Sequence, residues 1–472
     1  MNTPTLTYPR LEVSPEEVFT QETFEKLTAY LFSWQQAPGA LGGLHLHPCW
    51  SETSSLTRRY HGQTACFSSF LIDGVLRLHE VTKDRRWEKM AHQIAENILF
   101  LQAQEGGFIH ASAEFEPTYT CQETCPIHQF LPIQALLRYA EWDGARTELR
   151  EEVRQAIDRH WHWFQAEWWM RGNGWQHPLP LPGWCGVTNQ DLVVVAALAW
   201  YGRVFGDSSR YDQYGKLVLD AYLSPAYYHE TLGLFERGDK PNFVERTNYY
   251  DLILDAMEII HACTGDERLP HVMENVILAF EGAAFQTPDA LVHLAWGAET
   301  DPVDKTRICG WIREQIVMAA YPSHLVHLRR FLQRKDSAVI QSLTDGLEKT
   351  LAAYTYADGT IPGSLGKAPL LSIVPGSDVL RFWLFLIHYL GKSVKSPTRK
   401  ESVPIVRKAG SLEWATNQRL WQICDGGVRQ FGGLKNNPSA ISVGPEEALP
   451  GADFSTLQHA DCLEILRDSH QV

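Results

Sequence analysis

Short polar junctions recur along this chain at a nearly constant interval, and they constrain the fold more than any other feature of the sequence. Each junction has one marker residue, and successive markers are spaced by roughly sixty positions. The markers are Asp84, Asp143, Asp207, Asp266, Pro322 and Gly391. A repeat of this length fits a helical hairpin with its loops. The sequence therefore predicts a stacked or closed array of helix pairs.

The two helices beside each junction differ in polarity. The helix before the junction is apolar on nearly every side, as in residues 192–200, which is typical of a helix buried all round. The helix after it is amphipathic, with Leu149, Val153 and Ile157 on one face. An inner ring of apolar helices inside an outer ring is an all-α (α/α)6 toroid. We expect a first outer helix near 21–36 and inner helices at 64–81, 127–141, 189–205, 248–263, 307–320 and 377–390.

Loop lengths indicate which end of the barrel carries the chemistry. The connections from inner to outer helices hold only a few residues, so that end offers little surface. The connections from outer to inner helices are long, and loops of that length in a compact domain are commonly functional. We expect the active site there, at the N-terminal ends of the inner helices. The long loops are 105–126, 171–188, 223–247, 286–306 and 356–376.

Composition limits the domain organisation and the partners. We expect one barrel over 1–392, followed by a basic linker and a small C-terminal extension over 393–472 that packs on it, with helices near 412–420 and 460–469. A net charge of −14 argues against nucleic acid as the main partner. Nine scattered cysteines suit reduced thiols, and we see neither a membrane span nor a signal peptide. We therefore expect a cytoplasmic protein without a membrane partner, and a homo-oligomer stays open.

Two aspartates are the main catalytic candidates. Asp191 opens the third inner helix and Asp251 opens the fourth, one repeat later, so they occupy corresponding positions. Two carboxylates facing one cavity can divide the acid and base roles of glycosidic bond cleavage. Glu123, before the second inner helix, is a third candidate. The alternative for each aspartate is a structural role, because helix capping and the helix dipole favour Asp in a first turn.

The same loops hold residues suited to binding a sugar. Trp175, Trp184 and Trp296 can stack against sugar rings. The predicted partner is an oligosaccharide, anionic if local arginines hold it, and we expect no cofactor and no resident metal. The polar binding candidates are Asn189, Arg246, Asn248, Tyr249, Tyr250, His128 and His61.

One helix resembles a known enzyme family. Asn189-Gln190-Asp191-Leu192, followed by an apolar helix that ends at Phe205-Gly206-Asp207, resembles the helix with a catalytic aspartate in the unsaturated glucuronyl hydrolases. These belong to the six-hairpin (α/α)6 glycosidase group. Asp251, one repeat later, resembles that family's second aspartate, whereas Gln190 stands where the family has His. The resemblance implies removal of a 4,5-unsaturated uronic acid by hydration of its double bond, with an aspartate as general acid and base.

Other functions stay open from the sequence. A uronate lyase would use Arg, His and Tyr for β-elimination, and the loops supply these types. They are Arg58, Arg59, Tyr60, His61, His128, Arg246, Tyr249 and Tyr250. A zinc-dependent toroid enzyme would need soft ligands, and two groups of such residues occur. They are His45, His47 and Cys49, and Cys121, Cys125, His128 and Cys185. A toroid that binds sugar without turnover is the last alternative.

Overall fold

The fold is known from a computed structural model, which describes only part of the chain. The described residues are 13–33, 65–66, 68–100, 102–108, 126–165, 186–238, 240, 242–355, 359–363, 365–366 and 377–397, together with short strands between 405 and 442.

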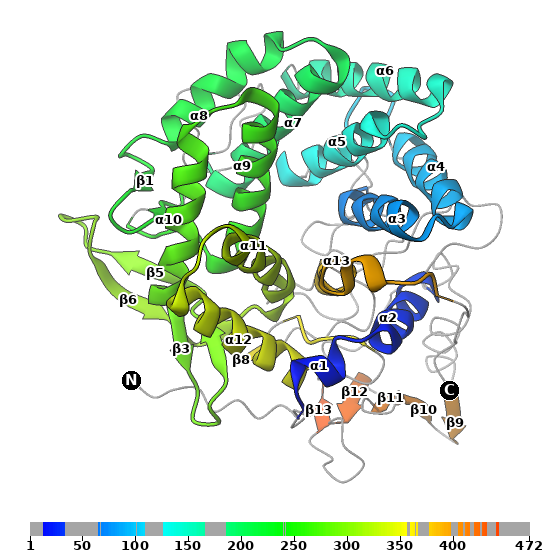
Figure 1. Ribbon diagram of the computed structural model, residues 1–472, viewed down its shortest axis with the longest axis vertical. Helices are drawn as coiled ribbons and strands as arrows, with labels where there is room; N and C mark the ends of the chain where they lie inside the picture. The colour runs from blue at the N-terminus through cyan, green and yellow to red at the C-terminus, as the bar shows by residue number, and fades with distance from the viewer. Residues whose placement is uncertain are drawn as a thin grey trace.

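Among the described residues, helices form two concentric rings (Figure 1). Each inner helix contacts the next, and the last contacts the first, so the inner ring closes. It consists of α3 (Ser68–Thr82), α5 (Pro126–Glu141), α7 (Thr188–Phe205), α9 (Tyr250–Thr264), α11 (Tyr321–Arg334) and α13 (Ser377–Leu390). The outer ring consists of α2 (Gln21–Ser33), α4 (Arg85–Phe100), α6 (Thr147–Trp163), α8 (Lys216–Tyr222), α10 (Arg268–Ala283) and α12 (Ala338–Ala353). The predicted (α/α)6 toroid is confirmed.

Glycine and aspartate recur at the short junctions because each meets a separate requirement. Gly206 and Gly265 follow α7 and α9 with φ of 76° and 71°, a left-handed conformation that costs glycine little. The aspartate then accepts a hydrogen bond from a backbone N–H two residues later, at the start of the next helical segment. These bonds run to Asp84 from Arg86 (2.9 Å), to Asp207 from Ser209 (3.0 Å) and to Asp266 from Arg268 (3.1 Å).

The fifth hairpin differs from the prediction. Residues 307–320, expected as an inner helix, instead form β6 (Ile308–Ile312), β7 (Gln315–Ile316) and the 3₁₀ turn η5 (Met318–Ala320). The inner helix of this hairpin is α11. It can contain Pro322 because this residue lies in its first turn, where a missing N–H breaks no helical hydrogen bond. Pro322, which the sequence predicts as a junction marker, lies inside α11 instead. The true junction is residues 335–337, and the Ser337 hydroxyl caps α12.

The long connections contain small antiparallel hairpins. β1 (Tyr228–His229) pairs with β2 (Leu234–Phe235), and β3 (Ala284–Gln286) pairs with β4 (Val292–Leu294). β5 (Gly297–Thr300) pairs with β6, and β7 pairs with β8 (Leu365–Gly366). They precede α9, α11 and α13 in the chain. Long outer-to-inner connections were therefore predicted correctly, although their β structure was not.

The ring closes through close packing of its first and last inner helices. A Cβ atom on Gly74 of α3 would lie 2.1 Å from the ring of Trp383 of α13, so only glycine fits there. The indole Nε1 of Trp383 donates a hydrogen bond to Thr28 Oγ1 of α2 (2.9 Å). Trp383 of α13 thereby contacts both α3, the first inner helix, and α2, the first outer helix. None of the helices in the described ranges is long and apolar enough to cross a membrane.

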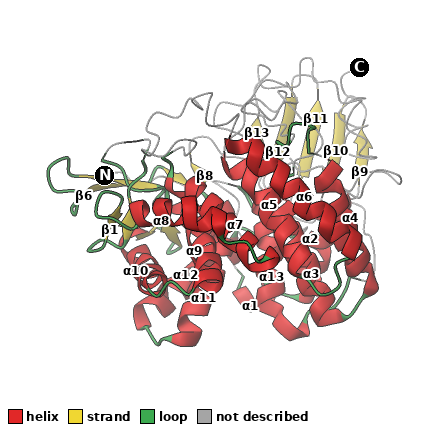
Figure 2. Ribbon diagram, turned by 90° about the horizontal axis from the view of Figure 1, so that it is seen from above, coloured by secondary structure: helices red, strands yellow, loops and turns green. Residues whose placement is uncertain are grey.

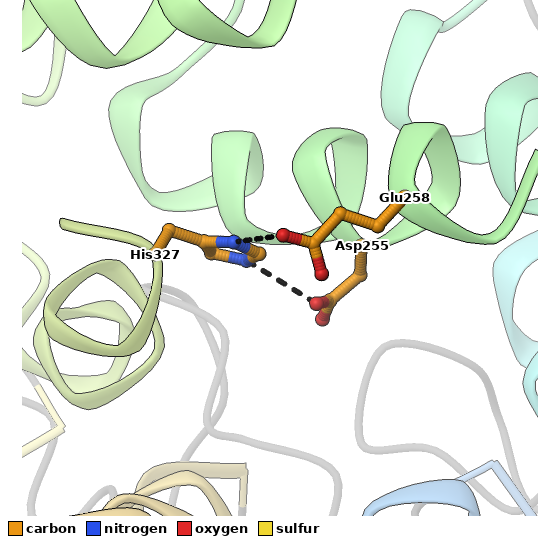
Figure 3. Close-up of side chains that lie close together, drawn as sticks. All are labelled: Asp255, Glu258 and His327. Atoms are coloured by element: carbon orange, nitrogen blue, oxygen red, sulfur yellow. Dashed lines mark ion pairs between the residues drawn. The ribbon is translucent and has the colours of Figure 1, made fainter. Parts of the chain in front are cut away.

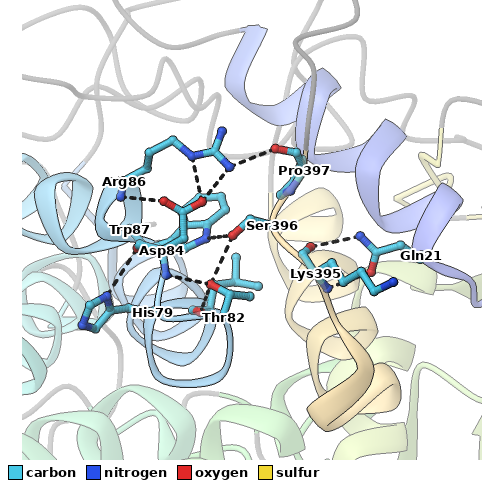
Figure 4. A network of polar contacts seen from close by, with 10 residues as sticks. Gln21, His79, Thr82, Asp84, Arg86, Trp87, Lys395, Ser396 and Pro397 are labelled. Carbon is cyan, nitrogen blue, oxygen red and sulfur yellow. Dashed lines mark hydrogen bonds and ion pairs between the residues drawn. The ribbon is translucent and has the colours of Figure 1, made fainter.

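The segment that follows α13 is tied back to the start of the barrel (Figure 4). After the 3₁₀ turn η6 (Gly391–Ser393), Lys395 exchanges two hydrogen bonds with the Gln21 side chain of α2 (2.9 and 3.0 Å). Ser396 Oγ accepts a hydrogen bond from Trp87 Nε1 of α4 (2.8 Å), and Pro397 O accepts one from Arg86 (3.0 Å). Residues 395–397, at the start of the predicted C-terminal segment, thus contact the first outer helices of the barrel.

The C-terminal part contains a sheet rather than the expected helix. The strands follow one another as an antiparallel meander in the order β13-β12-β11-β10-β9, and Figure 2 shows them outside the helical rings. The helix predicted at 412–420 is wrong, because apolar residues there alternate with period two, as in Leu412 and Trp414. The helix predicted at 460–469 lies outside the described residues. The strands are β9 (Ile405–Lys408), β10 (Ser411–Ala415), β11 (Leu420–Cys424), β12 (Gly427–Phe431) and β13 (Ala440–Ser442).

Candidate functional site

The two predicted aspartates lie in the first turns of neighbouring inner helices, at the same end of the barrel. Asp191 is the fourth residue of α7, and Asp251 is the second residue of α9. Both side chains are fully buried. This shared placement was predicted from their separation of one repeat, but their surroundings differ.

The carboxylate of Asp191 faces the outer ring. Its Oδ2 accepts hydrogen bonds from the Gly186 backbone N–H and from the Tyr222 hydroxyl of α8, both at 2.8 Å. These contacts tie the loop before α7 to the end of an outer helix. Such a pair of donors suits the structural alternative that the sequence left open for Asp191.

The carboxylate of Asp251 instead faces basic groups of the inner ring. Its Oδ2 lies 2.9 Å from Arg381 Nη2 of α13. Burial raises the pKa of Asp251 to about 6, with a further rise from Asp255, while Arg381 and His327 oppose the shift. A carboxyl that titrates near neutral pH can donate or accept a proton. Of the two aspartates, Asp251 therefore has the environment of an acid/base group.

Buried polar atoms without a hydrogen-bond partner gather at this end of the barrel. They belong to the start of α7, to the segment that leads into α9, and to α13. Buried polar atoms in proteins are nearly always satisfied, so such a group is suited to a polar ligand. Among the described residues no hydrogen-bond partner exists for Asn189 Oδ1, Glu245 Oε2, Arg246 Nε, Asn248 Oδ1 or Arg381 Nε.

An aromatic and basic edge lies beside the first turn of α9. The Arg246 guanidinium lies 4.2 Å from the ring centroid of Trp296 and 5.8 Å from that of Tyr249. All three side chains are half-buried. Arg246, Asn248 and Tyr249 belong to the segment and 3₁₀ turn η4 (Thr247–Tyr249) that precede α9. The structure thus brings three predicted binding residues together with Trp296.

Two other predicted binding residues have structural surroundings. The Tyr250 hydroxyl accepts a hydrogen bond from the Phe235 backbone N–H (2.9 Å), and burial raises the pKa of Tyr250 well above its ordinary value. His128 lies in the first turn of α5, and burial lowers its pKa to about 4. A tyrosine engaged in this way is a poor proton donor. His128 is neutral at physiological pH.

Several predicted residues lie outside the described part of the chain and stay predictions. They include the third candidate catalytic carboxylate, two loop tryptophans, one histidine, most of the candidate zinc ligands and three candidate lyase residues. They are Glu123, Trp175, Trp184 and His61, and His45, His47, Cys49, Cys121, Cys125 and Cys185, together with Arg58, Arg59 and Tyr60.

A cavity of about 1060 Å³ occupies the centre of the barrel. It begins near the N-terminal ends of the inner helices, at Ser69 and Leu252, and continues past the C-terminal ends of α3 and α5, at Lys83 and Asp143. The expectation that the short-turn end offers little surface is therefore wrong. The inner helices, predicted to be apolar on nearly every side, line the cavity with several charged side chains.

The cavity contains a charged cluster that the sequence interpretation missed. Asp255 and Glu258 of α9 flank His327 of α11, as Figure 3 shows, and Arg381 lines the same space. The sequence did contain a signal for this cluster. The predicted inner helix 248–263 holds three acidic residues at helical spacing, Asp251, Asp255 and Glu258.

Comparisons with known proteins establish the fold. No protein-family model matches this sequence, and no curated protein matches it. The cellobiose 2-epimerase from Bacillus thermoamylovorans is similar, with a TM-score of 0.54 at 12% identity, covering 79% of this chain and 100% of that chain. A sugar epimerase from a ruminal bacterium is similar with a TM-score of 0.54 at 11% identity, covering 78% of this chain and 98% of that chain. A glycosyl hydrolase family 88 protein from Bacteroides vulgatus is similar with a TM-score of 0.50 at 10% identity, covering 80% of this chain and 100% of that chain. At such identities the likeness is one of fold.

Proposed function

We propose that this protein is a carbohydrate-active enzyme that works at the N-terminal ends of the inner helices, with Asp251 as its general acid or base. The environment of Asp251 carries the proposal. Its carboxyl is buried, has a pKa of about 6 and lies 2.9 Å from Arg381. Both protonation states are then populated near neutral pH, as proton transfer in either direction requires.

The surroundings of Asp251 support a sugar as the substrate. Asn189, Asn248 and Arg246 present buried polar atoms without a protein partner in the described structure, and sugar hydroxyls can both donate and accept hydrogen bonds. Trp296 adds an aromatic face next to them. The similar structures are named as two sugar epimerases and a glycosyl hydrolase, which agrees with this substrate class.

For the reaction, we propose hydrolysis of an oligosaccharide that ends in a uronic acid, in the first instance a 4,5-unsaturated one. Protonated Asp251 would donate its proton to C4 of the double bond, and water would add to C5 and return a proton to Asp251. The hemiketal at C5 then opens to a ketone, and the hemiacetal left at C1 collapses to an aldehyde and releases the next sugar. Arg246 supplies a positive charge for the uronate carboxylate, and Glu123 remains the proposed partner carboxylate.

A uronate lyase is the second candidate. The Arg246 guanidinium beside Tyr249 favours it, because β-elimination needs a cation near the carboxylate and a group to transfer protons. Burial raises the pKa of Tyr250 well above its ordinary value, so Tyr249 is the better suited of these two tyrosines for that role.

One absorbance experiment tests both candidates. The purified protein is mixed with unsaturated uronate oligosaccharides and, separately, with intact uronate polymers, and the near-ultraviolet absorbance of the C4=C5 double bond is followed. We expect falling absorbance on the unsaturated oligosaccharides. Rising absorbance on intact polymers would replace the hydrolase with the lyase. Constant absorbance on both, with solvent deuterium entering a reducing sugar, would contradict both and favour epimerisation.

A further inference from the structure

Three carboxylates on one face of α9 are each paired with a cation from another inner helix. Asp251, Asp255 and Glu258 follow one another at helical spacing, so they line one face of the helix. Asp251 pairs with Arg381 of α13, Asp255 with His327 of α11, and Glu258 with Arg330 of α11 (2.6 Å). Charged groups thus run from the proposed catalytic carboxyl into the central cavity.

His327 is held between two of these carboxylates (Figure 3). Its Nε2 lies 3.2 Å from Asp255 Oδ1, and its Nδ1 lies 3.5 Å from Glu258 Oε1. Burial opposes a charge on this ring, but Asp255 and Glu258 outweigh it and raise the pKa of His327 to about 10. The ring is therefore an imidazolium at neutral pH.

This geometry fits a fixed cation better than a metal site, although the three side chains lie close enough together to hold an ion. A metal ion binds one ring nitrogen and needs its lone pair. Here the two carboxylates face opposite nitrogens of His327, and Arg330 already occupies Glu258. The two carboxylates keep His327 charged.

We propose that Asp255, held by His327, is a positioning residue whose negative charge counteracts that of Arg381 at the Asp251 carboxyl. Asp255 lies one helical turn from Asp251, and its charge favours the protonated form. Arg381, at 2.9 Å, favours the ionised form. The consequence for catalysis rests on the proposed function, whereas the effect on Asp251 itself does not.

Other charged groups on the inner helices are paired with each other. Asp73 of α3 and Arg138 of α5 form an ion pair between neighbouring inner helices (2.6 Å). Arg330 of α11 is paired with Glu258. Burial lowers the pKa of His324, also on α11, to about 3, so it is neutral. Among the described residues, Arg381, Asp255 and His327 are the charged groups with the largest effects on the pKa of Asp251, ahead of Arg246 before α9 and Asp191 of α7.

The test measures the titration of Asp251 directly in full-length protein without ligand. Aspartate labelled with ¹³C at the carboxyl carbon is incorporated, and the Asp251 resonance is identified by its loss in Asp251→Asn. In Asp255→Asn we expect the titration midpoint of Asp251 to fall by about one pH unit or more, because a like charge has been removed. Glu258→Gln is the matched control. It removes a carboxylate one turn further away, and we expect a much smaller shift.

The pH profile of turnover supplies the second reading. In Asp255→Asn we expect the limb of the pH profile that reports Asp251 to shift to lower pH, by the same amount as the titration midpoint of the Asp251 resonance. If the titration midpoint of Asp251 falls in Asp255→Asn but the wild-type protein turns over no uronate, the proposed function is contradicted and this inference still holds. Equal shifts in Asp255→Asn and Glu258→Gln, or none, would overturn the inference. So would stoichiometric Zn²⁺ binding that is lost in Asp255→Asn, because Asp255 would then be a metal ligand.

Discussion

Asp191 and Asp251 start neighbouring repeats with the same residue, yet their side chains meet different surroundings. Asp191 accepts two hydrogen bonds from the outer ring, whereas Asp251 faces Arg381 of the inner ring. Counted back from the glycine that ends each helix, Asp191 lies one position further from Gly206 than Asp251 lies from Gly265. One residue turns a helical side chain by about 100°. A one-residue offset between repeats is thus sufficient to place two aspartate side chains in different surroundings.

The largest expected effect is on turnover when Asp251 loses its acidity. We expect Asp251→Asn to lower kcat by at least about a hundredfold on the substrate found in the absorbance experiment, because a general acid or base contributes ~10²–10⁴. The amide keeps the shape of the side chain, so circular dichroism should show an unchanged fold. Near-normal turnover in this variant would remove the functional difference between the two aspartates.

The second expected effect is on the pH dependence of stability. The pKa of Asp251 is raised from 3.8 to about 6 on folding, so the folded state binds this proton more tightly than the unfolded state does. The resulting stabilisation is fully present below about pH 4 and is lost as the pH rises through about 6. Relative to Asp251→Asn, the wild-type protein should lose about 2 kcal/mol of unfolding free energy between about pH 4 and pH 7.

Urea unfolding at a series of pH values measures this difference, and Asp191→Asn serves as the comparison. A difference curve for Asp251→Asn that is flat between about pH 4 and pH 7 would show that the carboxyl titrates as an exposed one does. The structural distinction between the two aspartates would then be wrong.

The repeat in the sequence was sufficient to predict the toroid, and at two junctions, Gly206-Asp207 and Gly265-Asp266, a glycine ends one helix and an aspartate caps the next. The prediction failed at the fifth hairpin. In the fifth hairpin Pro322 starts a helix, and Ser337 takes the place of the capping aspartate. A proline suits both a turn and a first helical turn, so only tertiary packing separates the two.

The candidate site was predicted in position but not in its interactions. Helix N-termini and long loops pointed to residues that the structure places near the first turn of α9, including Arg246, Asn248 and Trp296. Arg381 and His327 were missed because they belong to later inner helices, α13 and α11, and lie far from Asp251 in the sequence. A single sequence gives the spacing of the carboxylates along α9, but it contains no measure of which cations from other helices face them.

The smallest expected effect belongs to Asp191, through stability rather than turnover. Asp191→Ala leaves the Gly186 N–H and the Tyr222 hydroxyl without their acceptor. Two buried donors without a partner should lower the free energy of unfolding by about 2 kcal/mol. In Asp191→Asn the amide oxygen can still accept both bonds, so we expect most of the stability to remain and turnover to fall less than tenfold. Urea unfolding and kcat are measured on both variants. If Asp191→Asn kept its stability but lost at least about a hundredfold in turnover, Asp191 would be the catalytic carboxylate that the sequence first indicated.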